Sequence, residues 1–216
     1  WRKQAVNLNA FIYLHGEIGE FGAVLVIGGG DTGSDCVGTA IRQGAKKVTQ
    51  IEILPQPPDK RAEDNPWPYF GKIMKTSTSH EEGCERRWSL STVKFHGMQQ
   101  RVTHAEVEEV TWEKVEGRYT MKPVPGTRQH IEAELILLAM GFVHPQHEGL
   151  LNELGIDLDQ RKNIGIDRST MATNVEKVFA TGDAVNGASL VVTAIASGRR
   201  TAKKIDDYLL GAENRV

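Results

Sequence analysis

The order of apolar and polar residues beyond position 20 predicts a strand, a helix and a second strand. Residues 23–27 are all apolar and too few for a helix, which favours a strand buried on both faces. Helical spacing of apolar residues follows, and Gly44 stands where glycine often ends a helix. Residues 47–54, KVTQIEIL, are again rich in β-forming types. A strand, a helix and a strand within about 30 residues form a βαβ unit, which implies a parallel sheet.

Four later segments alternate between apolar and polar residues, as antiparallel strands do. They are STVKFHG (91–97), QRVTHAEVEEVTWEK (100–114), RYTMKPV (118–124) and QHIEAELILLAM (129–140). Before them, the proline-rich and charged residues 55–89 break the rhythm, so we expect a long functional loop or a partly helical excursion there. The predicted fold class is therefore α/β: a Rossmann-like domain with a parallel sheet and a small antiparallel sheet.

The two ends of the chain carry other patterns. Residues 1–20 have no sustained period and are expected to be a linker or flanking segment, with one short strand at 11–14. Towards the C-terminus the pattern predicts a short amphipathic helix at 150–154, a strand at KVFATGD (177–183) and a long helix over 189–210.

Composition narrows the classes of partner. The 26 basic and 28 acidic residues give a net charge of −2, so there is no basic excess to attract nucleic acid or anionic lipid. The most apolar run, residues 135–143, is shorter than the roughly 20 residues of a membrane helix. Cys36 and Cys84 form no CxxC pair, which favours a reducing, cytoplasmic location. The chain begins with Trp1, so we interpret it as a trimmed piece.

Glycines between the first strand and its helix indicate a dinucleotide site. In VLVIGGGDTGSDC, residues 24–36, Gly28, Gly30 and Gly33 satisfy G-x-G-x-x-G in a strand–turn–helix context. The first glycine permits a tight turn, the second lets the backbone approach a pyrophosphate, and the third lets helix and strand pack closely. Gly29, Asp31 and Thr32 belong to the same loop and helix start. A tight turn with a purely structural role is the alternative interpretation.

Glu52 is the candidate for ribose recognition. It lies 22 positions after Gly30, at the end of the second predicted strand, where an acid usually accepts the ribose hydroxyl of NAD. Lys60 and Arg61 follow and would instead favour the 2′-phosphate of NADP. The preference between NADH and NADPH therefore stays open, and so does an exposed, solvated turn.

Several blocks resemble a known family of flavoproteins with two dinucleotide-binding domains. ATGDA before an apolar helix is similar to their flavin-contacting end, and ELILLAMGF to their crossover strand near the nicotinamide. More narrowly, five blocks in order from residue 24 onwards resemble the small (β) subunits of glutamate synthases. They are GGGDTGSDCVGTAIRQGAKKVTQIEILPQPP, NPWP, KTSTSHEEGCER, LLAMGF and SLVVTAIASGRR.

The resemblance implies an oxidoreductase that passes hydride from NADPH or NADH to FAD. Electrons would then pass through iron–sulfur clusters to a large (α) subunit that forms glutamate. It implies a pyrophosphate site at the glycine loop, an adenosine-ribose site at Glu52, Lys60 and Arg61, and a nicotinamide site and a flavin site elsewhere. The nicotinamide residues would be Ala139, Met140 and Gly141, and the flavin residues Gly182, Asp183, Ser189, Leu190 and Val191.

The chain also departs from the family pattern. The family's cysteine-rich cluster domain and first glycine fingerprint for FAD are not in this sequence. Val185, Asn186 and Thr193 stand where a basic pair and an aromatic residue are usual. The resemblance therefore implies a C-terminal fragment, with an NAD(P)H-binding domain at 21–143 and the C-terminal strand and helix of an FAD-binding domain at 144–216, whose FAD site the missing part would complete.

Two other functions remain open. A non-catalytic nucleotide-binding or docking module would explain the missing FAD fingerprint. A related electron-entry subunit could serve another acceptor, such as ferredoxin or a pyrimidine.

The remaining reactive side chains point to no catalytic residue and no metal site. Cys36 falls inside the predicted helix and is expected to be a small core residue. His80 and Cys84 have i, i+4 spacing, but two ligands are too few for a metal site. His144 and His147 suit a surface loop, and the alternating acids of EVEEVTWEKVEG (106–117) suit a solvated strand face.

Overall fold

The computed structural model describes residues 22–69, 71–99 and 101–213 of the chain. The chain divides into two compact units, one reaching to Met140 and the other starting at Gly141, and each is described by itself. The linker predicted at 1–20 and its strand at 11–14 lie outside the described residues.

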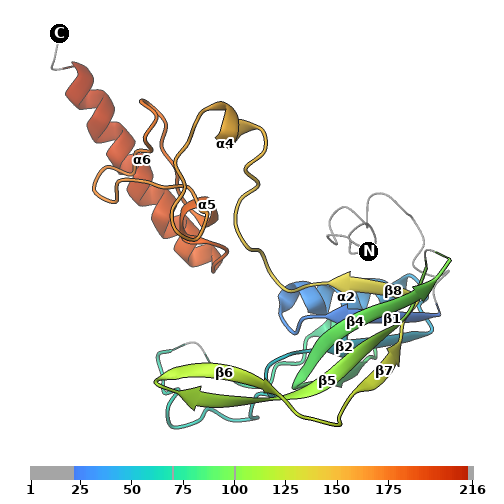
Figure 1. The fold of residues 1–216 in the computed structure, drawn as a ribbon. Helices are drawn as coiled ribbons and strands as arrows, with labels where there is room; N and C mark the ends of the chain where they lie inside the picture. The colour runs from blue at the N-terminus through green and yellow to red at the C-terminus, as the bar shows by residue number, and fades with distance from the viewer. Residues whose placement is uncertain (1–21, 70, 100, 214–216) are drawn as a thin grey trace. The chain divides into compact units, whose positions relative to one another are not determined.

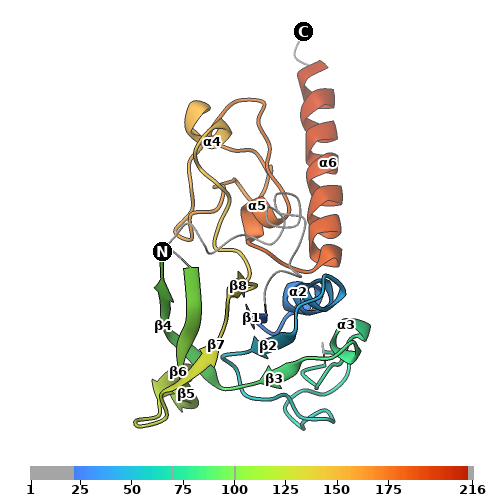
Figure 2. The ribbon, with the colours of Figure 1, turned by 90° about the vertical axis from the view of Figure 1, so that its right-hand side faces the viewer.

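The first unit contains the predicted βαβ element within a four-stranded parallel sheet of order β3-β2-β1-β8, whose order can be followed in Figure 2. The central strand β1 pairs with β2 on one side and with β8 on the other. The bounds are β1 (Ala23–Ile27), α2 (Asp31–Arg42), β2 (Lys47–Ile51), β3 (Glu85–Arg87) and β8 (Leu135–Leu138). Gly44 follows α2 with a φ of +91°, as a helix-ending glycine should. The predicted parallel sheet is confirmed.

A second, antiparallel sheet is built around the long strand β5, which pairs with β4 and β7 along its first part and with β6 along its last part (Figure 1). Its strands are β4 (Leu90–Met98), β5 (Arg101–Val115), β6 (Arg118–Pro123) and β7 (Gln129–Glu132). This sheet confirms the fold class.

One strand prediction was wrong in its grouping. The run 129–140 is not one antiparallel strand, because β7 joins the antiparallel sheet and β8 joins the parallel one. In β8 the successive residues Leu135, Ile136 and Leu137 are all buried, which suits a parallel strand covered on both faces.

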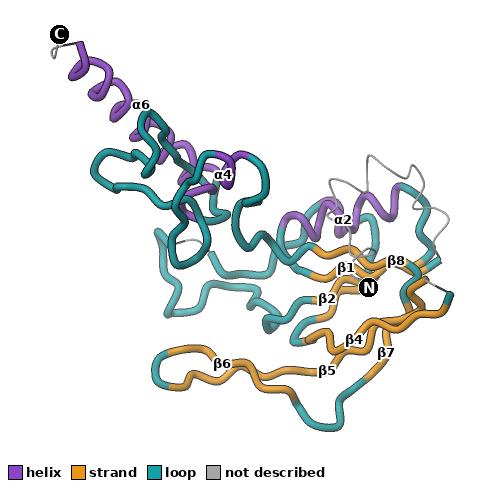
Figure 3. Tube along the Cα trace, turned by 45° about the horizontal axis from the view of Figure 1, so that its top comes forward, coloured by secondary structure: helices purple, strands orange, loops and turns teal. Residues whose placement is uncertain are grey.

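Three layers result within this unit, with α2 on one face of the parallel sheet and the antiparallel sheet on the other (Figure 3). One core lies under α2, and in it the thiol of Cys36 is fully buried beside Val26 and Leu137. Burial, and then the charge of Asp35, raise the pKa of Cys36 to about 12. This confirms Cys36 as a core residue. The second core joins the two sheets through Leu25, Ile27, Ile51, Leu90, Ala105, Val107, Ile131, Ala133 and Ile136.

The excursion 55–89 is mostly irregular and contains α3 (Thr78–Glu81) before β3. This agrees with the predicted loop with partial helix. The Ser77 hydroxyl caps α3 by accepting from the His80 backbone N–H.

The second unit contains α4 (Leu150–Glu153), α5 (Asp183–Asn186) and α6 (Val191–Glu213). Its small core includes Leu151, Ile164 and Val185. The helices predicted at 150–154 and 189–210 are confirmed. The strand predicted at 177–183 is wrong. Phe179 makes only an isolated bridge to Ala172, because the described part of this unit offers no neighbouring strand to form a ladder.

Within the described residues, no helix combines the length and apolar character needed to cross a bilayer.

Candidate functional site

Two of the three motif glycines are required by packing. Gly28 has a φ of +125°, which favours glycine, and a Cβ there would overlap the carbonyl oxygen of Ala139. Gly33 lies in the first turn of α2, where a Cβ would overlap the carbonyl oxygen of Gly28. Any side chain at either position would push the loop, α2 or the end of β8 out of place.

Gly30 is different, because the fold itself does not require it to be glycine. Its φ is −81°, which any residue adopts, and nothing lies within 4 Å of a Cβ built there. The backbone therefore faces open space immediately before α2. The first amides of a helix lack intrahelical acceptors and form its positive end, so this position can hold an anion. The exposed Asp31 and Thr32 begin the helix beside it.

Glu52 lies beside this loop, as its position after β2 predicted, and it also holds the loop in place. Its Oε2 accepts the Gly29 N–H at 2.6 Å, and its Oε1 accepts the Leu54 N–H at 3.1 Å. A carboxylate offers about four acceptor positions, so this one retains capacity for ribose hydroxyls. The contact with Gly29 was not foreseen, because the sequence does not show which atom of the loop faces the end of β2.

A cavity of about 850 Å³ opens beside the glycine loop and Glu52. Its walls are Gly29, Gly30, Asp31, Ser34 and Glu52, parts of the excursion between Leu54 and Ser77, and the side chains of His80, Arg86, Trp88 and Tyr119. Such a volume falls in the range of small-molecule and cofactor sites. The proline-rich excursion therefore forms one wall of the candidate site.

Lys60 and Arg61 are not among the described residues that line this cavity. Arg61 donates from Nη1 to the carbonyl oxygens of Asn65 (3.2 Å) and Tyr69 (2.8 Å), within its own loop. Arg86 does line the cavity, together with Lys72 and Lys75. Its guanidinium carbon lies 5.2 Å from the centre of the Trp88 ring, and its Nη1 donates to the Lys75 carbonyl oxygen at 3.1 Å. Arg86 was missed because β3, which carries it, comes far after the glycine loop in sequence.

A chain of polar contacts ties the excursion to the glycine loop. Gln50, only 2% exposed, donates to the carbonyl oxygen of Gly28 at 2.8 Å. Its Oε1 lies 2.9 Å from Nε2 of His80, whose Nδ1 lies 3.0 Å from the Ser77 hydroxyl. Partial burial, and then the charge of Arg86, lower the pKa of His80. The sign of this chain in the sequence is Gln50 inside β2, at a strand position that turns out to be buried.

The three residues predicted for the nicotinamide side follow β8. The Ala139 N–H donates to the carbonyl oxygen of Ile27 at 2.8 Å, which brings Ala139 next to Gly28. Met140 is 66% exposed, and Gly141 has a φ of +79°.

The residues predicted for the flavin side lie in the second unit. Gly182, with a φ of +66°, precedes α5, whose first residue is Asp183. The Asp183 carboxylate accepts a hydrogen bond of 3.0 Å from the Ser189 hydroxyl. Leu190 and Val191 are exposed at the start of α6.

Comparison with curated proteins shows similarity to the small chains of glutamate synthases. The glutamate synthase [NADPH] small chain of Mycobacterium tuberculosis (strain H37Rv) is 46% identical over 189 residues. The match covers 88% of this chain and 38% of that protein, so this chain spans well under half of its relative's length. The glutamate synthase [NADH] of Saccharomyces cerevisiae is 38% identical over 200 residues, with 87% and 9% covered.

Comparison with solved structures supports the fold. The crystal structure of T. acidophilum thioredoxin reductase superposes with a TM-score of 0.56 at 22% identity, covering 87% of this chain and 53% of that one. A family model described as pyridine nucleotide-disulphide oxidoreductase matches residues 13–198. The chain therefore belongs to the pyridine nucleotide-disulphide oxidoreductase family.

Proposed function

We propose that this chain is the NAD(P)H-binding part of a glutamate synthase small subunit, in which hydride passes from NADPH or NADH to FAD. The similarity to glutamate synthase small chains supports the proposal. The observation that carries it is Gly30, whose lack of a side chain leaves open space at the start of α2. Selection for packing does not explain a glycine there, whereas close approach of a pyrophosphate does.

In this proposal the pyrophosphate lies against the amides that begin α2, near Gly30, Asp31 and Thr32. The adenosine ribose reaches Glu52, which the Gly29 N–H already orients. The cavity beside them holds the rest of the adenosine, with Arg86 rather than Arg61 facing it. The reduced coenzyme supplies the hydride when bound, and the chain's own residues bind and orient it.

The nicotinamide end would lie against Ala139, Met140 and Gly141. The exposed Met140 side chain offers an apolar surface to a flat ring. At Gly141 a Cβ would meet no atom within 4 Å, so a ligand can approach the backbone there. Hydride transfer needs no acid or base, so positioning and exclusion of water account for the rate.

The second unit would contribute one part of an FAD site. The amides near Ser189, Leu190 and Val191 come at the start of the long helix α6, where the partial positive charge of the helix end would favour a negatively charged flavin. Gly182 and Asp183 would hold the ribityl-phosphate end of FAD. The hydrogen bond from the Ser189 hydroxyl to the Asp183 carboxylate holds this turn in place. The rest of the FAD site would come from a part of the small subunit that this chain does not contain.

In the whole enzyme, electrons would leave FAD through iron–sulfur clusters for the glutamate-forming large subunit. Reconstitution with that subunit tests this role. Glutamate formed from glutamine and 2-oxoglutarate supports it, whereas coenzyme oxidation that serves only ferredoxin or a pyrimidine would assign the chain to a different electron-entry protein.

The coenzyme proposal is tested by calorimetric titration of Gly30→Ala with NADPH and NADH. The added methyl group meets no protein atom, so the melting temperature should stay near that of the wild type. It would obstruct the pyrophosphate, so affinity should fall at least about tenfold, or about 1.4 kcal/mol. Gly198→Ala is the matched control, because its Cβ is also unobstructed and it lies in α6. Unchanged affinity in Gly30→Ala, or no binding by the wild type at millimolar coenzyme, would contradict the proposal.

A further inference from the structure

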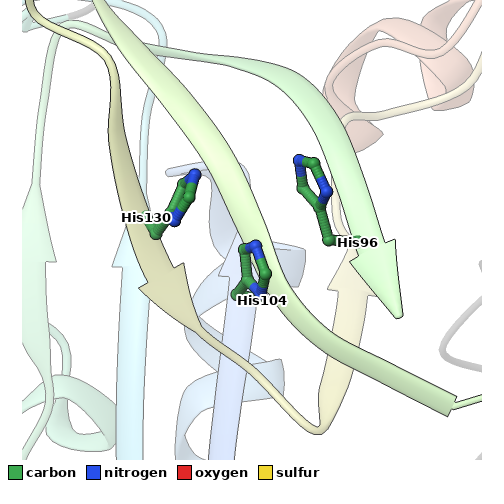
Figure 4. Close-up of side chains that lie close together, drawn as sticks. All are labelled: His96, His104 and His130. Atoms are coloured by element: carbon green, nitrogen blue, oxygen red, sulfur yellow. The ribbon is translucent and has the colours of Figure 1, made fainter. Parts of the chain in front are cut away.

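Three histidines far apart in sequence come together on the antiparallel sheet (Figure 4). His96 lies on β4, His104 on β5 and His130 on β7. Since β5 lies between the other two strands, His104 is the central ring. The centroid of the His104 ring lies 4.6 Å from that of the His96 ring and 4.5 Å from that of the His130 ring. One potential ligand nitrogen from each ring lies within 4.8 Å of the others.

The strand register explains why these rings share a face. His96 is directly opposite His104, and His130 is opposite Glu106, two residues after His104. Side chains alternate along a strand, so the intervening Ala105 and Ile131 point the other way. Both of those are buried in the core between the two sheets. The histidine cluster therefore lies on the outer face of the antiparallel sheet.

Neighbouring polar groups orient two of the rings. Oε2 of Glu106 lies 3.0 Å from Nε2 of His96, and the Thr103 hydroxyl lies 3.1 Å from Nδ1 of His104. Each ring then keeps its other nitrogen for a ligand. Metal-binding imidazoles are commonly fixed in this way by a partner at the second ring nitrogen.

We propose that His96, His104 and His130 form a binding site for a borderline divalent transition-metal ion, represented by Zn²⁺. Three imidazoles from three strands can form the protein part of an open zinc site, with water as the fourth ligand and Glu106 as the partner that orients His96. Nitrogens bound to a tetrahedral zinc ion are roughly 3.3 Å apart. Side-chain rotations that move the ring nitrogens by about 1–2 Å would therefore bring them to bonding distance of one ion. Mg²⁺ and Ca²⁺, which take oxygen ligands, are excluded by this donor set.

The bound ion would cross-link the three strands β4, β5 and β7 through one histidine from each. An ion that binds the folded chain and not the unfolded chain stabilises the fold and raises the melting temperature. The site lies on a different set of residues from the coenzyme cavity, so the inference does not depend on the proposed function.

The test is calorimetric titration of the metal-stripped full chain, free of any histidine tag, with Zn²⁺ at pH near 7.5. We expect one ion per chain, with a rise in melting temperature, and no uptake of Mg²⁺. Co²⁺ should give the visible absorption of a tetrahedral site. His104→Gln and His130→Gln should each weaken Zn²⁺ binding at least about tenfold, the lower limit for losing even an outer-sphere partner. His130 is exposed, so its replacement leaves the fold in place.

His144→Gln is the matched control. His144 stacks on His147 at 4.4 Å, and the described residues add no third ligand to that pair. This variant should bind Zn²⁺ like the wild type. The inference is overturned if the wild type takes up no Zn²⁺ at millimolar concentration, or if both cluster variants bind it as tightly as the wild type does.

Discussion

At the scale of single residues, Glu52 both holds the glycine loop in place and lines the candidate coenzyme cavity. The spacing of Glu52 from the glycines does not distinguish these two roles. Its carboxylate accepts the N–H groups of Gly29 and Leu54 and so holds the glycine loop to the end of β2. It also carries a negative charge at the rim of the cavity, where a 2′-phosphate would be repelled. A substitution that keeps an acceptor oxygen but removes the charge separates these two purposes.

Glu52→Gln is therefore expected to weaken binding of NADH more than that of NADPH. The amide oxygen can still accept the Gly29 N–H, although the contact of Oε1 with the Leu54 N–H is lost, and the charge that favours an unphosphorylated ribose is removed. Calorimetric titration with both coenzymes measures the ratio of the two Kd values. Glu176→Gln is the control, because its side chain is 83% exposed in the second unit. Equal effects on both coenzymes would show that this carboxylate does not face the ribose.

At the scale of elements, the contact between β1, its glycine loop and α2 depends on a close backbone approach. A Cβ at Gly33 would meet the carbonyl oxygen of Gly28 and come within 2.7 Å of the Gln50 amide nitrogen. That nitrogen belongs to the polar chain through His80 that fixes the excursion. The lack of a side chain at Gly33 therefore allows α2 to pack on the loop after β1. It also leaves room for Gln50, which links the loop to His80 in the wall of the cavity.

Gly33→Ala should destabilise the chain despite the higher helix propensity of alanine. Propensity contributes about 1 kcal/mol in favour of alanine, while overpacking against fixed backbone costs about 1–3 kcal/mol or more. We expect a lower midpoint in urea unfolding, by circular dichroism, than for the wild type. Gly30→Ala, in the same loop but with open space at its Cβ, should unfold at nearly the wild-type midpoint. Equal midpoints for the two variants would be inconsistent with close packing at Gly33.

At the scale of the whole molecule, several groups with shifted pKa values make stability depend on pH in one direction. The pKa values of His80 and His104 are lowered from 6.5, in both cases first by partial burial. The unfolded chain therefore binds more protons than the folded chain as the pH falls through about 6.5. Glu106, whose pKa is lowered from 4.5 chiefly by the hydrogen bond from His96, adds stability that is lost at still lower pH.

The free energy of unfolding, measured by urea titration with a chelator present, should thus decrease as the pH is lowered from 7.5 to 5. His104→Gln should reduce this slope, because a titrating ring in contact with His96, His130 and Glu106 is removed. Stability that rises on acidification would contradict the lowered pKa values.

Much of the fold follows from local sequence. The five apolar residues of β1, the helix spacing of α2 and the glycines between them are near neighbours, so period and turn chemistry determine their structure. For the same reason the glycine loop and Glu52 could be identified before any tertiary contact was known. The run 129–140 was misread because nothing within it shows that β7 and β8 belong to different sheets.

The sequence by itself determined the βαβ unit, its glycine loop and the burial of Cys36, because each depends on residues within a few turns of one another. Only the tertiary structure decided which atom Glu52 accepts from, that Arg86 rather than Arg61 faces the cavity, and that His96, His104 and His130 meet. Glu52 and Arg86 come from segments far from the glycine loop in sequence, and His130 reaches the other two histidines through β7, so only the packing of the two sheets on one core brings these groups together.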